Sequence, residues 1–160
     1  MTPVSSVYCI DSSSIIHAWR RAYPPNIFST LWQKIDHLID DGRLVASVEV
    51  LHELKKKDDD IYDWAKDRKE SLFVQVDDET QESLVLIMAN YPKLVDTGKG
   101  KSGGDPFVIA LAHCRDPKLT VVTEEKGGSD AKPKIPHVCT CLGVLSIDVL
   151  NLITQEKWSF

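Results

Sequence analysis

The stretch Val7-Tyr8-Cys9-Ile10-Asp11 is an apolar run that ends in an acid. A short continuous apolar run is typical of a strand buried on both faces of a parallel sheet. Leu44-Val45-Ala46 and Leu119-Thr120-Val121-Val122-Thr123 have the same character. Segments with helical spacing of apolar residues separate these runs, so strands alternate with helices through most of the chain. The alternation predicts an α/β fold, a three-layer α/β/α sandwich with a mostly parallel central sheet.

Residues 1–160 are expected to form a single domain, because the length suits one core and there is no linker or repeat. Ser47 is a suitable cap for one helix, and Asp77 or Asp78 for another. Asp105-Pro106 is a typical helix start. Further strands are expected at 72–76 and 138–144, and helices at 13–21, 27–41, 47–57, 61–71, 77–90, 105–114 and 146–157.

The overall charge argues against a broad basic surface for nucleic acid. The 160 residues carry a formal net charge of −5, while an apolar fraction of 42% is typical of a globular protein. A small basic rim around an acidic centre remains compatible with this balance. The N-terminal residues show no signal-peptide pattern, and no apolar run reaches transmembrane length. A cytoplasmic protein without membrane contact is therefore expected.

The cysteines are Cys9, Cys114, Cys139 and Cys141. Most lie within apolar patterns, which favours small buried side chains over metal ligands. Cys139-Thr140-Cys141, with His137 nearby, has the spacing of half a zinc site. No second Cys/His pair with ligand spacing completes it, so zinc is the less favoured interpretation.

Acidic residues recur where the predicted strands end or helices begin. Asp11 follows the first strand, Glu53 lies in the helix after the second, Asp105 opens a helix, and Glu124 and Glu125 follow the strand near 119–123. The carboxyl ends of parallel strands meet at one edge of a sheet, where ligands bind. Carboxylates gathered there favour a hard cation such as Mg²⁺ or Mn²⁺.

Each acid also has an ordinary structural explanation. Asp11 and Asp105 are good helix caps. Glu53 precedes Lys57 by four residues, the favourable order for an ion pair on a helix surface. Glu49 lies four residues before Glu53 and is an equivalent candidate by position alone. The individual signals are weak, and their ordered combination carries the argument.

The loop Gly98-Lys99-Gly100-Lys101-Ser102-Gly103 matches a dinucleotide-binding pattern, and Glu124 follows about twenty residues later. That pattern requires a firm strand before the first glycine, and 91–96 is a poor one. Asp105 at the next helix start would also repel a pyrophosphate. Nucleotide binding through Gly98–Gly103 is thus an alternative to the metal hypothesis, and a basic loop is the simpler explanation.

The acid-bearing segments together resemble the PIN-domain family of metal-dependent nucleases. Residues 7–13 resemble its first strand and acid, and 47–54 its helix with a Glu, a match that selects Glu53 over Glu49. Residues 104–112 resemble its third-acid helix, and 121–125 a strand that ends in Thr-x-Asp. Glu125 stands here where the family has Asp, with Glu124 as an alternative and Asp130 as a remote one. Residues 135–139 resemble the entry to the last strand in a less characterised bacterial PIN-like branch.

The resemblance implies an Mg²⁺- or Mn²⁺-dependent endoribonuclease that leaves 5′-phosphate and 3′-hydroxyl ends. One or two ions would be held by four acids, and two hydroxyl residues, Ser13 and Thr123, would orient waters or ligands around them. The four implied ligands are Asp11, Glu53, Asp105 and Glu125.

Many PIN proteins of this size resemble toxins that a small antitoxin protein silences. The implied partners are an RNA substrate, an antitoxin and a second copy of the chain, with Trp32, Trp64 and Trp158 as candidate exposed aromatics. A catalytically weak PIN-like binding module is the alternative, because of the Glu at the fourth position. RNA phosphates would be contacted by lysines in two loops: Lys99, Lys101, Lys126, Lys132 and Lys134.

Overall fold

A computed structural model describes residues 6–94 and 105–160 of the chain. Its centre is a five-stranded sheet with all strands parallel, in the order β3-β2-β1-β4-β5. The strands are short, and the chain returns from β3 at one edge to β4 on the other side of β1. The predicted α/β sandwich is confirmed. The strands are β1 (Tyr8–Ile10), β2 (Leu44–Ser47), β3 (Phe73–Val74), β4 (Thr120–Val122) and β5 (Ser146–Ile147).

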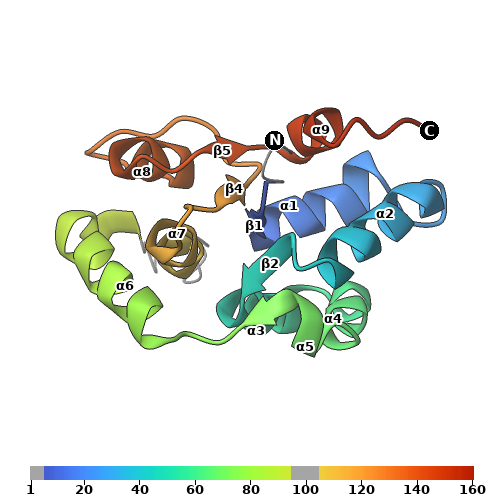
Figure 1. Ribbon diagram of the computed structural model, residues 1–160, viewed down its shortest axis with the longest axis horizontal. Helices are drawn as coiled ribbons and strands as arrows, with labels where there is room; N and C mark the ends of the chain where they lie inside the picture. The colour runs from blue at the N-terminus through green and yellow to red at the C-terminus, as the bar shows by residue number, and fades with distance from the viewer. Residues whose placement is uncertain (1–5, 95–104) are drawn as a thin grey trace.

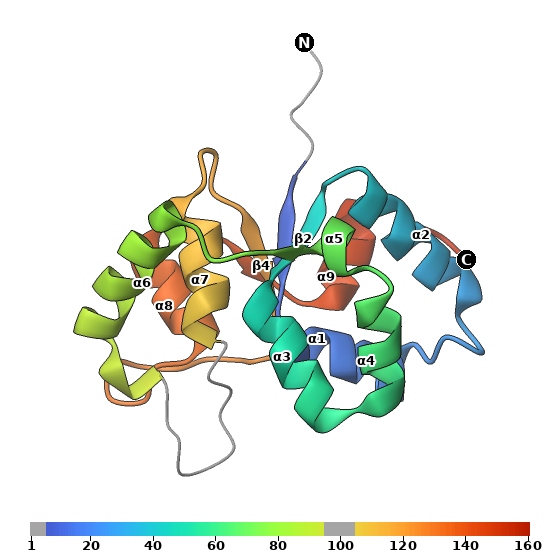
Figure 2. The same ribbon diagram turned by 90° about the horizontal axis from the view of Figure 1, so that it is seen from below.

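Helices cover both faces of the sheet (Figures 1 and 2). α6 (Asp78–Asn90), α7 (Asp105–Cys114) and α8 (Ile135–Leu142) lie on one side. The other side carries the remaining α-helices, with α3 packed against α1 and α4. These are α1 (Ser12–His17), α2 (Ser29–Asp40), α3 (Val48–Lys57), α4 (Asp59–Lys66), α5 (Lys69–Leu72) and α9 (Val149–Gln155); a π-helical turn, Ala18–Ala22, and a 3-10 turn, Pro92–Leu94, complete the set in the described ranges.

The strand order creates a switch point between β1 and β4. The chain moves from β1 to β2 and β3 in one direction, and β4 and β5 lie on the opposite side of β1. Ile10 pairs with Val122, and the Asp11 amide donates to the Val122 carbonyl at 3.0 Å. Ligands of open α/β sheets bind at the carboxyl edge of such a point. Asp11 and Thr123, which directly follow the two central strands, are therefore placed at that edge.

The strand expected at 138–144 is wrong, because this segment belongs to α8. Ile135, Val138 and Cys139 are buried and repeat at helical rather than strand spacing. Pro136 lies in the first turn, where proline is tolerated, and Gly143 ends the helix with a φ of +71°. The last strand is only Ser146–Ile147, and the last helix begins after its cap, Asp148. The single helix expected at 61–71 is likewise two helices, α4 and α5.

The tryptophans expected to be exposed are mostly packed together. Trp32 is buried, and its ring meets those of Trp19 and Trp64 edge-on at centroid distances of 5.2 and 5.3 Å. The Trp32 indole nitrogen also donates to the Tyr23 carbonyl at 2.7 Å. Trp158 is half-buried against the core. The three rings join the π-helical turn, α2 and α4, and they do not identify a dimer surface. Among the described residues, no helix is both long and apolar enough to cross a bilayer.

Asp77 begins α6 as its N-cap, as one of the two expected alternatives. Its carboxylate accepts from the Thr80 amide at 2.9 Å and from the Thr80 hydroxyl at 2.6 Å. These bonds lower the pKa of Asp77 to about 2. Since the folded pKa lies below the ordinary value, this stabilisation is present at neutral pH and is lost as the pH falls toward 2.

Asp77→Ala is expected to lower the free energy of unfolding by about 1 kcal/mol at pH 7, because two donors at the helix start lose their acceptor. Asp77→Asn should lose only a fraction of that, since an amide oxygen also caps a helix. Urea denaturation of the three proteins measures both differences. Equal losses for alanine and asparagine would show that the charge, and not the cap, is what stabilises α6.

Candidate active site

Asp11 is held at the carboxyl end of β1 by donors from three directions. Its carboxylate accepts from the Ser14 amide at 2.8 Å and from the Thr123 hydroxyl at 2.5 Å. The Ser13 hydroxyl lies 2.9 Å from both carboxylate oxygens and donates to this group. Asp11 thus caps α1, as its ordinary structural explanation requires, and is also anchored to the strand β4 side through Thr123. The anchoring fixes its orientation at the switch point.

The Asp11 carboxylate is 2% exposed, and the donors that hold it are neutral. Burial raises its pKa to about 6, against the lowering effect of the bonds from Thr123, Ser14 and Ser13. A buried carboxylate with neutral donors is poorly stabilised as an anion. A divalent cation would supply the missing countercharge, so the site's chemistry fits a hard metal ion.

The hydroxyls of Ser13 and Thr123 link Asp11 to the segment after β4. Ser13 accepts from the Glu124 amide at 3.3 Å, and Thr123 accepts from the Glu125 amide at 3.1 Å. Each hydroxyl therefore donates to the carboxylate and accepts from the backbone. Their observed role is to position Asp11 and residues 124–125 relative to one another.

Glu53 faces the same region from α3. Its carboxylate accepts from the Ser12 hydroxyl at 3.2 Å, and Ser12 is adjacent to Asp11 in the chain. The expected pair with Lys57 is present but long, at 3.9 Å. The Glu53 side chain is 13% exposed, while that of Glu49 is 34% exposed and lies 3.6 Å from His52. Glu53 rather than Glu49 is the residue of α3 that points toward α1.

Asp105 is the first residue of α7 and is 6% exposed. Its buried position at a helix start fits both expectations, helix capping and metal binding. Phe107 to Ala112 continue into a helix with most side chains buried, and α7 packs against β1, β2 and β4. The core contacts of α7 thus position Asp105 relative to the sheet.

Glu124 and Glu125 are both bonded to the starts of later helices. The Glu125 carboxylate accepts from the Ile135 amide at 3.0 Å, at the beginning of α8. The Glu124 carboxylate accepts from the Val149 amide at 3.3 Å, at the beginning of α9. The charges of both Asp11 and Glu125 add to burial in raising the pKa of the Cys139 thiol to about 12, so these two carboxylates lie near one thiol. Each glutamate thereby has a capping role that the sequence did not indicate.

The four predicted ligands do not form a closed cluster. In residues 6–94 and 105–160, no three of these acids bring carboxylate oxygens within 4.8 Å of one another. Ser12, the neighbour of Asp11 in the chain, donates a hydrogen bond to the Glu53 carboxylate. The Thr123 hydroxyl connects the Asp11 carboxylate to the Glu125 backbone amide. The carboxyl edge also carries a depression of about 190 Å³, lined by residues that include Thr123, Glu125, Lys126 and Asp148. Of the four predicted ligands, only Glu125 lines this depression.

The described lysines of the predicted basic rim have exposed side chains. Lys126 forms an ion pair with Asp148 at 3.1 Å. Lys132 and Lys134 are exposed in the segment that leads into α8. Lys99 and Lys101 lie outside the described residues, as does the glycine pattern of Gly98–Gly103.

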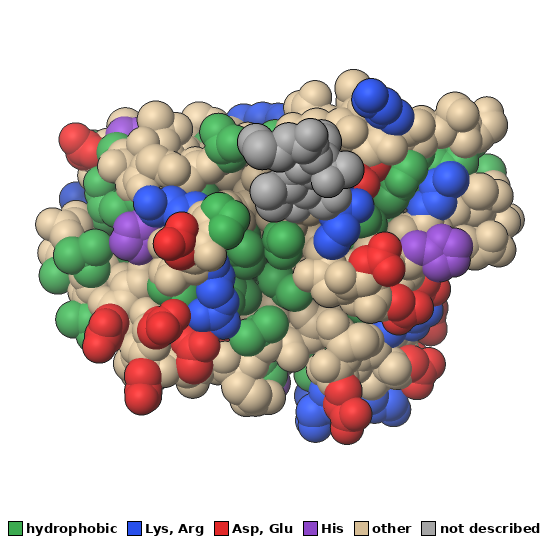
Figure 3. Space-filling view, viewed as in Figure 1, with side chains coloured by type: hydrophobic (Ala, Val, Ile, Leu, Met, Phe, Trp, Pro, Cys, Tyr) green, Lys and Arg blue, Asp and Glu red, His purple; other side chains and the backbone are tan. Residues whose placement is uncertain are grey.

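The opposite face of the molecule, at the amino ends of the strands, is different in character (Figure 3). Apolar side chains gather near its centre, and charged side chains of both signs surround them. A hollow of about 640 Å³ lies at this edge, lined by residues that include Val7, Val45, Leu111 and Arg115. Asp11 follows the carboxyl end of β1, so it lies at the opposite edge of the sheet from this hollow. This hollow is thus not the candidate active site.

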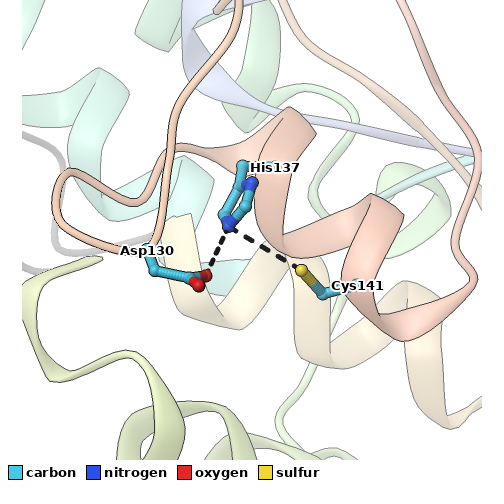
Figure 4. Close-up of side chains that lie close together, drawn as sticks. All are labelled: Asp130, His137 and Cys141. Atoms are coloured by element: carbon cyan, nitrogen blue, oxygen red, sulfur yellow. Dashed lines mark hydrogen bonds and ion pairs between the residues drawn. The ribbon is translucent and has the colours of Figure 1, made fainter.

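The structure also brings together three polar side chains that the sequence argument did not group. Asp130, His137 and Cys141 bring one potential ligand atom each within 4.8 Å of one another, on the exposed side of α8 (Figure 4). Cys139 and Cys141 do not form half a zinc site, in line with the favoured interpretation of Cys139 as a buried side chain, because residues two apart on a helix face different directions. The signal that could have found the group is the i, i+4 spacing of His137 and Cys141.

The family model that matches this sequence is described as a domain of unknown function, DUF4411, and the match covers residues 8–160. The chain belongs to this family. No curated protein matches the sequence. This member of the DUF4411 family thus has an α/β sandwich with a parallel central sheet, and acidic residues lie at the carboxyl edge of that sheet.

Two crystal structures share this fold. VapBC2 from Rickettsia felis, bound to a DNA fragment from its promoter, aligns with a TM-score of 0.54 and 12% identity, over 89% of this chain and 98% of that chain. FitAcB from Neisseria gonorrhoeae aligns with a TM-score of 0.52 and 15% identity, over 88% and 96% of the two chains. At such low identity the likeness concerns the fold alone.

Proposed function

We propose that this DUF4411 protein is a metal-dependent endoribonuclease of the PIN type, acting in the cytoplasm as the toxin of a toxin–antitoxin pair. The observation that carries the proposal is the buried Asp11 carboxylate at the switch point, surrounded by neutral donors and approached by Glu53. The structural neighbours, VapBC2 and FitAcB, support it at the level of fold. An antitoxin is the proposed protein partner.

The proposed ligands of Mg²⁺ or Mn²⁺ are Asp11, Glu53 and Asp105, with Glu125 or Glu124 as a fourth. Carboxylate oxygens suit these cations, and Mg²⁺ retains several waters, so a few carboxylates suffice. When bound, the ion would lower the pKa of a water and stabilise charge on the phosphate and leaving oxygen. The part of Ser13 and Thr123 is to hold Asp11 in one orientation and keep residues 124–125 beside it.

The glutamates after β4 each use one carboxylate oxygen as a hydrogen-bond acceptor, and the other oxygen could bind the ion. Both now accept from helix amides, at Ile135 and Val149. Bound RNA phosphates would be contacted by exposed lysines, with Lys126, Lys132 and Lys134 among the described ones and Lys99 and Lys101 as further candidates. Such contacts make RNA affinity fall as salt rises.

The test is cleavage of a mixed RNA pool by the untagged protein, with Mn²⁺ and with a chelator. We expect cleavage that the chelator abolishes and that added Mn²⁺ restores. Glu53→Gln should lower the rate by about 10–100-fold, because the amide weakens the metal site. Glu49→Gln is the matched control on the same helix and should stay near the wild-type rate.

Equal cleavage rates for Glu53→Gln and Glu49→Gln would show that Glu53 is not a metal ligand. Absence of Mn²⁺-dependent cleavage over RNAs of varied sequence, in a protein that binds Mn²⁺ through Asp11, would favour the PIN-like binding module instead.

A further inference from the structure

We infer that Asp130, His137 and Cys141 form a second metal site, selective for a zinc-class ion and separate from the carboxylate edge. The three side chains converge on the outer side of α8, and a dashed contact joins the His137 ring to each of the other two (Figure 4). His137 Nε2 lies 2.8 Å from Asp130 Oδ1 and 3.7 Å from Cys141 Sγ. The inference does not depend on the proposed nuclease activity.

The helix α8 sets two of the three donors. His137 and Cys141 are separated by four residues, so they lie on one face of the helix, one turn apart. Cys139 lies on the buried side, with its thiol in the core. Cys141 is exposed and His137 half-buried, so solvent ions have access to both. The helix therefore presents an imidazole and a thiol as a prearranged pair.

A closed turn brings the third donor to this pair. The Ser129 amide donates to the Lys132 carbonyl at 3.0 Å, and the Lys132 amide donates to the Ser129 hydroxyl at 3.1 Å. Asp130 lies inside this turn. Just before it, Gly128 has a φ of +107°, and a Cβ there would lie 2.9 Å from the His137 Cβ. Only glycine allows the loop to approach α8 so closely, so the backbone itself is adapted to this contact.

The geometry is unlike a nucleophilic triad. In such a triad the acid bonds to Nδ1 and the thiol to Nε2, on opposite sides of the ring. Here both partners lie at Nε2. Three donor atoms that share a centre suit an ion between them, and not a proton relay through the ring.

The distances are close to those of a tetrahedral zinc site. Bond lengths of zinc to nitrogen, oxygen and sulfur imply ligand separations of about 3.6 Å for N···S and about 3.3 Å for N···O. The N···S separation is already 3.7 Å, and the N···O separation must widen from 2.8 Å. The exposed Asp130 side chain, 89% accessible, can make that small movement.

The donor set selects the class of ion. A thiolate and an imidazole favour zinc and similar transition metals, and disfavour Mg²⁺ and Ca²⁺. One carboxylate and one thiolate balance a dication, and water would fill the fourth position. On binding, the thiol proton passes to solvent, and the ring proton resides on Nδ1, so that neutral imidazole binds through Nε2. The ion would tie the 126–134 loop to α8, the helix whose first amide is bonded to Glu125.

The decisive experiment is titration of the tag-free, chelator-treated full-length protein with Co²⁺, followed by displacement with Zn²⁺. One equivalent should give wild type a thiolate-to-cobalt charge-transfer band, and Co²⁺ bound by the carboxylates alone should add no such band. Cys141→Ser should lose that band, and His137→Gln should bind at least about 10-fold more weakly. Cys114→Ser is the matched control, since Cys114 is half-buried and bonded to the Leu111 carbonyl. It should retain both the band and the stoichiometry.

A thermal measurement gives an independent readout. Zn²⁺ at about 100 times its dissociation constant should raise the melting temperatures of wild type and Cys114→Ser by about 5 °C more than that of Cys141→Ser. An unchanged cobalt band in Cys141→Ser would overturn the assignment. So would the absence of Co²⁺ and Zn²⁺ binding by wild type at tens of micromolar metal. Neither result would bear on RNA cleavage, because the readouts are spectral and thermal.

Discussion

Replacing Asp105 with asparagine is expected to lower Mn²⁺-dependent RNA cleavage by about 10²–10³-fold while the protein stays folded. Asp105 is buried at the start of α7. Asparagine has the same size and serves at a helix start nearly as well as aspartate, so local structure should persist. It lacks the charge that a hard cation requires. The measurement is the initial rate at saturating Mn²⁺, with circular dichroism to verify the fold.

Asp77→Asn provides the control for this prediction. It makes the same chemical change at the start of another helix, α6, where the carboxylate is occupied by Thr80 and paired with Arg115. Its cleavage rate should stay within about twofold of wild type. If both variants lose activity equally, the loss reflects helix starts in general. If both retain it, Asp105 does not belong to the catalytic group.

The parallel sheet and its acidic edge could be predicted because both follow from local patterns. Apolar runs that end in a polar residue mark buried strands, and parallel strands collect their carboxyl ends. Asp11 therefore lies where the apolar run Val7–Ile10 predicts it, directly after the first strand, at the switch point beside Thr123. The helix caps Ser47 and Asp77 could also be predicted from the sequence, because a cap bonds to an amide only two or three residues later.

The segment after β4 could not be predicted in the same way, because long-range contacts determine it. The side chains of Glu124 and Glu125 turn toward amides 25 and 10 residues later, and no local pattern encodes those partners. The 138–144 segment contains enough β-branched and small apolar residues to suggest a strand. Its helical period was visible in Ile135, Val138 and Cys139, and the proline and glycine at its ends support the same period.

The second cluster was missed for a related reason. His137 and Cys141 form a recognisable pair only once their segment is known to be helical. Asp130 joins them through a turn and a close glycine contact, which are features of three-dimensional packing. The Cys139-Thr140-Cys141 spacing alone instead groups Cys141 with Cys139, the thiol that the fold buries.

Asp11→Asn is expected to make the metal-free protein more stable at alkaline pH, although it should remove activity. Burial raises the folded pKa of Asp11 from 3.8 to about 6. A raised pKa means that protonation stabilises the fold, so the benefit is complete below pH 4 and is lost as the pH rises through 6. Above that range the shift corresponds to a cost of about 3 kcal/mol in the wild type. Asparagine is neutral throughout and avoids this cost.

The prediction is measured as the difference in unfolding free energy between Asp11→Asn and wild type, by urea denaturation in the presence of a chelator. Asparagine keeps an acceptor for Ser14 but fits the bonds of Ser13 and Thr123 less well, which costs about 1 kcal/mol. The variant should then be about 2 kcal/mol more stable at pH 8. Its advantage should be smaller by about 1.5 kcal/mol at pH 5, since the penalty is only partly developed there.

Mn²⁺ should reverse the order of stabilities at pH 8. An ion that binds the folded wild type through Asp11 raises its unfolding free energy by mass action, and the neutral amide gains little. This reversal reports binding without any need for the right RNA. A variant less stable than wild type at pH 8 without metal would show that the bonds from Ser13 and Thr123 outweigh the cost of burying the charge. In that case Asp11 would be explained as a structural cap, and the buried carboxylate would no longer support a metal site at the end of β1.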